Sequence, residues 1–463
     1  MKTVVSIGRR NWFNRKPVNL LYTADSVPFK GNAFLPGVAV IPLRQHEGNA
    51  ARPVVSPGTH VREGQLIAAA GGAPSAPVFS SIPGILREYR TVPLADQTLT
   101  EAAVIQLEGP FDISGKERPV FSWEAESPGM LLKLTEEFGL VGTFGSPQPL
   151  GYQLRSFLAD FSAASPEGNP ADQGVLAVRM FDLDPSCFTD RFLVRSRLDM
   201  VLQGCRIAAK ILGVQKFCFI YDRKAAVIRE LPENLFGSPG LEVRSAVTSG
   251  VYPCGDTVLC KETAAKTFEK CRATDIFCLD PWTAFSLYET AVFRHPCLHR
   301  PLLVAGSAIH VPQILNVRIG TRVGDVIEEC GGFKVSPAKI VAGGLLTGRA
   351  LYDLDTPIDR NVRSLHFMTK DESPVRPVSP CIHCGRCLRI CPQHLDPARM
   401  AALLQRNAFS SGSGYGPALE AALSRCIGCG SCSAVCPARI PLHHIARNAL
   451  PSALRMEKSG GSV

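Results

Sequence analysis

The sequence predicts a multidomain protein of the α/β and β classes with a C-terminal α-helical module. At 463 residues the chain is too long for one hydrophobic core, and it suggests about three or four domains. The pattern changes along the chain, from short apolar runs between turn residues to strand–helix–strand units. Near the C-terminus, two runs place eight cysteines at one repeated spacing.

These changes of pattern divide the chain into five parts. We expect an N-terminal region with a β barrel or sandwich, an α/β domain of nucleotide-binding type, a β-grasp module, a cysteine-rich helical module and a tail. Their expected bounds are 1–115 (with the barrel at about 36–90), 120–300, 301–352, 375–450 and 451–463.

The N-terminal part has short apolar runs separated by turn signals. Pro57-Gly58 and Pro83-Gly84 are typical of turns, and many short strands at this spacing favour a small barrel or sandwich. The run from Gly58 to Ala68 resembles biotinyl- and lipoyl-type hammerhead domains. Those domains carry their group on a lysine, and this chain has no lysine between Lys30 and Lys116. We therefore expect a hammerhead-like scaffold without covalent lipoate or biotin.

The middle part predicts an α/β unit. Residues 175–178 and 216–221 have the composition of buried strands, and residues 191–212 between them have the periodicity of a helix. Strand, helix and strand at this spacing indicate parallel strands. Such sheets bind ligands beyond the carboxyl ends of their strands.

The next part has a different order of elements. Residues 302–306 and 314–319 are strand candidates, residues 324–332 predict a short helix with glycines at its end, and residues 339–345 end the unit. Strand, strand, helix and strand within about 50 residues favour a β-grasp module.

Each cysteine run has the spacing C-x2-C-x2-C-x3-C-P. Thiolates are soft ligands for iron–sulfur clusters or zinc. The spacing is that of bacterial ferredoxins with two [4Fe–4S] clusters, in which the fourth cysteine of each run ligates the other cluster. We expect one cluster on Cys381, Cys384, Cys387 and Cys436, and the other on Cys391, Cys426, Cys429 and Cys432. A pair of zinc knuckles is the alternative.

Charge and hydropathy restrict the partners. The net charge is +9, and from Arg376 onward there are ten Lys/Arg against three Asp/Glu. A basic face attracts an acidic protein such as ferredoxin or flavodoxin, or an anionic membrane surface, although a solvated charged face is equally compatible. Without aromatic interleaving we expect no nucleic-acid partner. No run approaches the ~20 apolar residues of a membrane span, and no signal peptide is expected.

Several segments together resemble one family, the C subunit of Rnf-type electron transport complexes. These complexes move electrons between ferredoxin and NAD while translocating ions. The resemblance lies in the segments 41–55, 59–68, 317–333, 341–351, 353–360 and 426–442. The middle domain also resembles, more distantly, the flavin-binding subunit of respiratory complex I. Together they imply FMN and NAD(H) as candidate cofactors beside the two [4Fe–4S] clusters.

The resemblance also indicates where a flavin and NADH would bind. The family's glycine-rich loop aligns with residues 139–149, its acidic segment with 181–186, and a third run with 255–259. The implied cofactor residues are Gly139, Gly142, Gly145, Asp182, Asp184, Gly255 and Asp256. Val141 and Thr143 replace two of the family's glycines, and Pro147 and Pro149 interrupt the loop. The site is therefore either retained or reduced to packing.

We therefore expect the protein to be a peripheral subunit on the cytoplasmic face of the inner membrane. It would pass electrons between NADH, ferredoxin or flavodoxin and other subunits of a membrane redox complex, with no residue assigned a catalytic role. Two alternatives remain open. One is a soluble flavin and iron–sulfur reductase of the cobalamin-reductase kind, and the other is a non-enzymatic electron-transfer subunit that has lost flavin and NADH binding.

Overall fold

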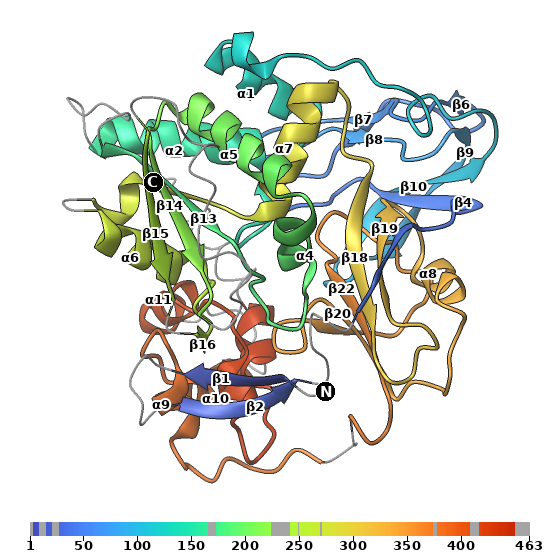
Figure 1. The fold of residues 1–463 in the computed structure, drawn as a ribbon. Helices are drawn as coiled ribbons and strands as arrows, with labels where there is room; N and C mark the ends of the chain where they lie inside the picture. Colours follow the sequence, from blue (N-terminus) through green and yellow to red (C-terminus); the bar gives the residue numbers. More distant parts are fainter. Residues whose placement is uncertain are drawn as a thin grey trace.

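The structure is a computed structural model of the chain. It describes residues 3–8, 15–20, 27–164, 173–223, 241–248, 250–268, 271–373, 377–407 and 416–449. Three bodies lie above a small helical module in the view of Figure 1: a barrel, an α/β unit and a six-stranded sheet.

The barrel consists of two small sheets that enclose one apolar core. The larger has the order β4-β10-β9-β6 and the smaller β5-β7-β8. Turn glycines and prolines separate the strands, as the sequence predicts. Their bounds are β4 Val38–Pro42, β5 Arg52–Pro53, β6 His60–Val61, β7 Leu66–Ala69, β8 Val78–Phe79, β9 Gly84–Pro93 and β10 Leu99–Leu107. Buried residues of both sheets, including Ile41, Ile67 and Leu86, pack together.

The α/β unit contains a parallel sheet with the order β15-β14-β13-β17. Alternate strand residues point to opposite faces. Leu176 and Phe217 pack with helices on one face, whereas Ala177 and Cys218 pack with a single helix on the other. The strands are β13 Val175–Arg179, β14 Lys216–Tyr221, β15 Glu242–Val247 and β17 Ile276–Leu279.

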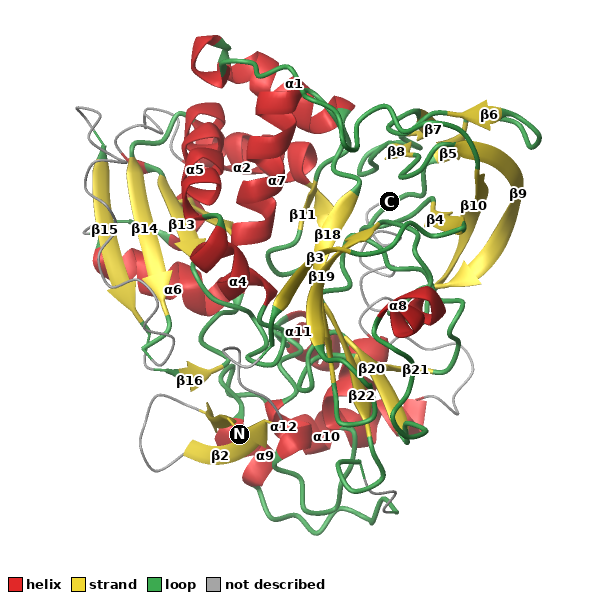
Figure 2. Ribbon diagram, turned by 45° about the vertical axis from the view of Figure 1, so that its right-hand side comes forward, coloured by secondary structure: helices red, strands yellow, loops and turns green. Residues whose placement is uncertain are grey.

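Helices cover both faces of this sheet (Figure 2). The first face carries α1 Pro128–Glu137, α2 Leu150–Ala164, α5 Leu198–Leu212 and α7 Pro281–Phe293, and the second carries α6 Thr257–Thr267. The helix expected over 191–212 is two helices, α4 Thr189–Ser196 and α5. The chain leaves the helical conformation at Arg197, where φ is −141° and ψ is 33°.

The six-stranded sheet has the order β21-β20-β22-β18-β19-β3. Its elements are β3 Phe29–Asn32, β18 His299–Ala305, β19 Gln313–Arg318, β20 Lys339–Ala342, β21 Arg349–Leu351 and β22 Ser364–Met368, with helix α8 Val323–Glu329. The sheet thus continues past residue 352, the expected end of the β-grasp module. It also takes in a strand from the N-terminal region.

The C-terminal module is helical. It contains α9 Arg386–Ile390, α10 Pro397–Asn407, α11 Pro417–Ser424, α12 Ser431–Ala434 and a helix at 442–449. The expected Ser/Gly loop at 410–416 lies almost entirely outside the described residues. Among the described helices of the chain, none has both the length and the hydrophobicity of a membrane-spanning segment.

An N-terminal hairpin lies against this module, far from the module in sequence. Strand β1 Thr3–Gly8 pairs antiparallel with β2 Arg15–Leu20 and parallel with β16 Val251–Tyr252. Figure 1 shows the hairpin, in blue, beside the orange and red helices. Ile7 packs with Tyr252, Leu346 and Ile390, so three distant segments meet at the cysteine runs.

Candidate functional site

The first cysteine run forms a loop that enters a short helix. His383 and Gly385 adopt positive φ angles of 53° and 67°, which turn the chain sharply before α9. Glycine adopts this conformation without steric cost. Cys387 lies within α9, Cys391 follows the helix, and both are buried, whereas Cys381 is exposed.

The second run repeats this geometry. Gly428 and Gly430 have φ angles of 61° and 74°, and α12 follows, carrying Cys432. Gly430 is required for a second reason, because a Cβ atom there would collide with the carbonyl oxygen of Leu346. The loop is therefore pressed against the end of the six-stranded sheet.

The fold brings the two runs together. Helices α9 and α12 are in contact. Cys387 packs in one apolar cluster with Cys432 and Cys436, whereas Cys391 packs in another with Cys426. Each apolar cluster thus contains the last cysteine of one run and one cysteine of the other, Cys436 with Cys387 and Cys391 with Cys426. The first also contains Cys432, which the expected ligand sets assign to the other iron–sulfur cluster.

The electrostatics of the thiols shows the same neighbourhood. Burial raises the pKa of the Cys432 thiol, and the nearby Cys429, Cys426 and Cys391 raise it further. Burial also raises the pKa of Cys429, to about 12. Free thiolates are unfavourable in this environment, and a bound metal centre would stabilise them. Among the described residues, no three His, Cys, Asp or Glu side chains converge on a point that could hold a single metal ion.

The second run is anchored to the rest of the protein through backbone contacts. The Tyr252 hydroxyl donates a hydrogen bond of 2.6 Å to the carbonyl oxygen of Cys429. Arg447, in the helix at 442–449, donates to the carbonyl oxygen of Thr347 at 2.9 Å. Sequence reasoning missed Tyr252, because nothing in the sequence around it indicates a contact with a residue almost 180 positions away.

The carboxyl edge of the parallel sheet is the expected place for a nucleotide. It is filled by a buried arginine. Arg179 ends β13, is fully buried, and donates to the carbonyl oxygens of Phe181 at 2.8 Å and Gly255 at 2.9 Å. Its guanidinium also lies 4.6 Å from the centre of the Phe144 ring, in the loop that aligns with the family's glycine loop.

A second arginine completes this buried network. Arg363 pairs with Asp190 at 2.7 Å and Asp280 at 2.9 Å, and also donates to the carbonyl oxygen of Thr143. Burial alone would raise the pKa of Asp280, but Arg363 and Arg179 outweigh it and the pKa is lowered. The Thr143 hydroxyl donates to Asp280 at 2.8 Å. Arg363 thus joins the loop at residues 139–149 to the carboxyl edge of the parallel sheet, which is the expected place for a nucleotide.

The three candidate glycines of the loop lie close to neighbouring segments. A Cβ atom on Gly139 would collide with the carbonyl oxygen of Pro77 in the barrel, and one on Gly142 would collide with the side chain of Gln153. Gly145 approaches Thr257 at the start of α6.

The candidate carboxylates also have protein partners. Asp182 accepts hydrogen bonds from the backbone N–H groups of Asp190 and Arg191 at the start of α4. Asp256 accepts from Val258 N–H and caps α6, and burial raises its pKa to about 6. Gly255 contributes its carbonyl oxygen, which accepts from Arg179.

Asp184 connects the α/β unit to the cysteine module. Its Oδ2 atom accepts from the N–H groups of Leu346 and Thr347 at 2.9 and 3.0 Å. The carbonyl of Leu346 in turn packs on Gly430. Asp184 therefore holds the segment on which the second cysteine loop rests.

The candidate cofactor residues at the sheet edge thus all have contacts within the protein. Asp182 pairs with Arg191 at 3.2 Å, Asp256 caps α6, and Asp184 accepts from backbone N–H groups. The cysteine module fits two iron–sulfur clusters, since buried and half-buried thiols of both runs are grouped together and its glycine loops turn tightly.

Comparison with known families supports the domain order. The chain matches the RnfC barrel sandwich hybrid domain over residues 30–110, the SLBB domain over 303–350 and the 4Fe-4S dicluster domain over 380–440. The last match contains all eight cysteines of the two runs. A multidomain protein with these three domains is therefore confirmed.

Curated relatives share most of the chain's length. The C subunit of the Na+-translocating ferredoxin:NAD+ oxidoreductase complex of Acetobacterium woodii is 29% identical over 377 residues, covering 80% of this chain and 82% of the relative. The C subunit of the proton-translocating ferredoxin:NAD+ oxidoreductase complex of Clostridium ljungdahlii is 30% identical over 382 residues, covering 81% and 80%. The C subunit of the ion-translocating oxidoreductase complex of Rhodobacter capsulatus is 28% identical, covering 80% and 70%.

Among solved structures, an NAD+-reducing [NiFe]-hydrogenase in the H2-reduced state matches with a TM-score of 0.49 and 14% identity, covering 72% of this chain and 62% of that one. This likeness is too weak to carry an argument. The sequence relatives and the three matched domains are sufficient: the chain belongs to the family of C subunits of ion-translocating ferredoxin:NAD+ oxidoreductase (Rnf-type) complexes.

Proposed function

We propose that this chain is a peripheral electron-transfer subunit of an Rnf-type membrane complex, on the cytoplasmic face of the membrane. It passes electrons between a soluble carrier and the membrane subunits. The observation that carries the proposal is the assembly of both cysteine runs in one compact module, in a chain whose relatives are subunits of such complexes.

The ligand sets of the proposal are Cys381, Cys384, Cys387 and Cys436 for the first cluster, and Cys391, Cys426, Cys429 and Cys432 for the second. Two [4Fe–4S] clusters supply one-electron transfer when bound. The protein holds their ligands on short helices, turns the loops through glycines, and fixes the second loop with Tyr252.

The two proposed cluster sites differ in exposure to solvent, which indicates the side from which a partner would approach the module. Cys381 is exposed, and its neighbours Val378 and Ile382 are 60% and 66% exposed. The second site is enclosed by Tyr252, Leu346 and Ile390. We propose that the first cluster meets the external partner, and that the second faces the body of the protein.

The chemistry of the external partner follows from the charge at this face. Arg386 and Arg389 are exposed and follow the exposed apolar residues Val378 and Ile382 closely in the sequence. Exposed apolar side chains and cations in one short segment suit an acidic carrier such as ferredoxin or flavodoxin, which would approach by electrostatic steering.

The α/β domain serves this proposal as a scaffold. We propose a domain of complex-I-flavoprotein type and a barrel of hammerhead type, both without a bound group, because Arg179 and Arg363 fill the sheet edge. Electrons then enter and leave through the cysteine module alone, which is the flavin-free form of the hypothesis. A flavin-dependent reductase is the outcome that the following test would reveal instead.

The test combines flavin analysis with partner capture. Anaerobically purified chain is expected to contain no FMN and to bind none on titration, while a tagged chain in native membranes co-purifies with integral membrane subunits. Stoichiometric FMN, or reduction of a corrinoid by the purified chain alone, would favour the reductase. A chain recovered without membrane partners would contradict the proposed place in a complex.

A further inference from the structure

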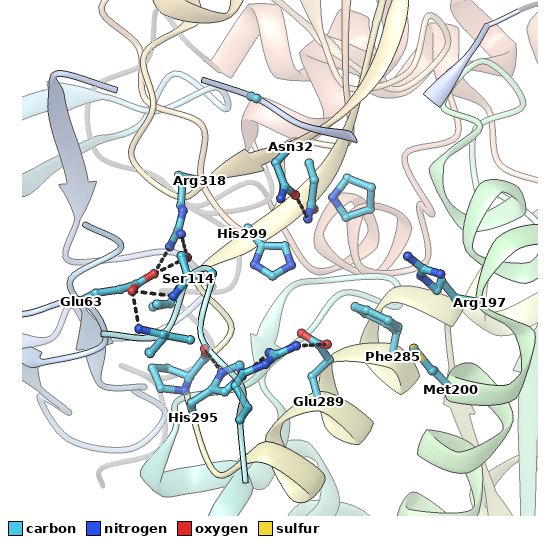
Figure 3. Close-up of a pocket in the computed structure, with 18 of the residues that line it drawn as sticks. Asn32, Glu63, Ser114, Arg197, Met200, Phe285, Glu289, His295, His299 and Arg318 are labelled. Carbon is cyan, nitrogen blue, oxygen red and sulfur yellow. Dashed lines mark hydrogen bonds and ion pairs between the residues drawn. The ribbon is translucent and has the colours of Figure 1, made fainter. Parts of the chain in front are cut away.

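A pocket of about 650 Å3 lies where the α/β unit, the six-stranded sheet and the barrel region meet. Helices α4, α5 and α7 supply one wall, strands β3, β18 and β19 another, and residues 113–118 a third. Figure 3 shows these side chains converging from the separate elements. The volume is that of a typical small-molecule site, and junctions between domains are a usual place for one.

One wall of the pocket is apolar. The rings of Phe29 and Phe192 lie 4.7 Å apart between centroids, and Phe285 and Met200 continue the surface from α7 and α5. Phe29 is 43% exposed, so this aromatic surface is open rather than packed away. A flat apolar group would find aromatic and thioether contacts along this wall.

Some polar groups on the opposite wall already form hydrogen bonds and ion pairs within the protein. Glu63 accepts from the N–H groups of Ile113 and Ser114 and from the Ser114 hydroxyl, and it pairs with Arg318 at 2.7 Å. Arg318 also donates to the carbonyl oxygen of Ser81. These contacts join the barrel to the six-stranded sheet. Because Glu63 and Arg318 are already paired within the protein, we do not assign them to a ligand.

Other groups in the pocket lack such partners. The Glu289 side chain is only 8% exposed, its Oε2 atom has no hydrogen bond, and its Oε1 atom lies 3.9 Å from Arg118. The carboxylate points into the pocket (Figure 3). Among the described residues, the side chains of His299 and Arg197 make no hydrogen bond or ion pair, although both line the pocket.

The charge in the pocket is positive overall. Arg118, Arg197, Arg318 and Lys116 are four cations against the carboxylates of Glu63 and Glu289. Burial lowers the pKa of His299 to about 3, and Arg318, His295 and Arg118 lower it further, so its imidazole is neutral and presents one N–H donor. Burial raises the pKa of the Glu289 carboxyl.

We propose that this pocket binds an organic anion with a flat apolar body. The body lies against Phe29, Phe285 and Met200, and the anionic group faces Arg197 and the N–H of His299. Since neither Arg197 nor the neutral His299 has a side-chain hydrogen bond or ion pair among the described residues, an anion can contact both without breaking one. A bound ligand would contact three parts of the fold at once, and would therefore hold them together.

The experiment uses a matched pair of probes, naphthalene-2-carboxylate and its uncharged amide. Anaerobic titration calorimetry on the full chain is expected to show one site for the carboxylate, with the amide at least about tenfold weaker, as for loss of one charge-assisted contact. Inorganic phosphate serves as a third probe, since an ion alone lacks the apolar contacts and should bind more weakly than the carboxylate.

Two variants locate the binding. Arg197→Gln should weaken the carboxylate about tenfold and leave the amide unchanged, whereas Arg87→Gln, on the exposed barrel surface, should change neither. Met200→Trp fills the apolar wall and should abolish binding of both aromatic probes. Iron content and thermal unfolding verify that each variant is folded. No binding of the carboxylate to the wild-type chain, or affinity indifferent to Arg197→Gln, would overturn the proposal.

Discussion

Buried ionisable residues affect the stability of this protein and its dependence on pH. Arg179, Asp190, Asp280 and Arg363 form ion pairs with almost no exposure to water. Breaking such a pair on one side leaves an uncompensated charge in the interior, which is far more costly than losing an exposed pair. These ion pairs therefore stabilise the fold only while all four residues are present.

Replacement of Arg363 tests this at the residue scale. Arg363→Met leaves Asp190 and Asp280 without their closest cation, and we expect a loss of about 3–5 kcal/mol of stability. Arg155→Met, which breaks an exposed pair with Glu136, should cost less than about 1 kcal/mol. Thermal unfolding followed by near-UV circular dichroism measures both. If the two substitutions lowered the free energy of unfolding equally, burial of the ion pairs would not be increasing the cost of breaking them.

A buried histidine should make stability depend on pH. The His46 ring accepts a hydrogen bond from Ala76 N–H at 3.1 Å, and burial lowers its pKa to about 4 from 6.5. The unfolded chain therefore binds a proton that the folded chain does not, and stability falls as pH falls from 6.5 toward 4. The contribution is about 2 kcal/mol between pH 7 and 5.

His46→Gln measures this contribution in urea denaturation at pH 7 and pH 5. The wild-type chain should lose more stability between the two pH values than the variant. His60→Gln, at an exposed histidine on β6, is the matched control and should behave as the wild-type chain. An identical pH dependence in the His46 variant would mean that its imidazole is not kept neutral by burial.

At the scale of elements, the cysteine module depends on strands from the other end of the chain. Strand β1 contacts α9 and pairs with β16, which carries Tyr252. The hairpin therefore covers one side of the second cysteine loop. An element that covers a buried redox site limits the access of water and oxygen to it.

Removal of residues 1–20 should expose the site. We expect the truncated chain to lose its charge-transfer absorbance in air several-fold faster than the full chain, since the packing of Ile7 on Tyr252 and Ile390 is lost. A chain shortened after residue 450 serves as the control for the loss of residues. Bleaching at the same rate in all three proteins would show that the hairpin does not protect the clusters.

The sequence predicted elements whose signal is local. The strands at 175–178 and 216–221 and the two cysteine runs are recognisable from composition and spacing, because period and ligand geometry involve near neighbours. The hairpin contact, the pairing of β3 with β19 and the role of Arg179 were not predicted. Each depends on a partner far away in sequence, such as Asp190 with Arg363, and no local pattern encodes such a pairing.

At the scale of the whole molecule, the cysteine module lies at one end of the fold, below the α/β unit and the six-stranded sheet in Figure 1. The apolar residues Val378 and Ile382 and the cations Arg386 and Arg389 are exposed there. Surface charge mainly affects the rate of association, and salt screens it. The proposed docking face should therefore be recognised by its dependence on ionic strength.

Charge removal at this face should slow electron transfer with an acidic carrier. Arg386→Gln combined with Arg389→Gln should lower the second-order rate of reduction by reduced ferredoxin about tenfold at low salt, and the difference should shrink at high salt. Arg87→Gln with Arg90→Gln, on the barrel, is the matched control. Stopped-flow absorbance follows the reaction. A rate that is insensitive to both salt and the first pair of substitutions would place docking elsewhere.

We propose that the two cysteine runs hold two cubane clusters with exchanged fourth ligands. The most direct test of this proposal is iron and sulfide analysis, with electron paramagnetic resonance after dithionite reduction, of the anaerobically purified wild-type chain and Cys436→Ala. We expect about eight irons and eight sulfides in the wild type, with the signals of two interacting clusters. In the variant we expect loss of the cluster of the first run. Zinc in place of iron, or loss of the second run's cluster in that variant, would contradict the proposal.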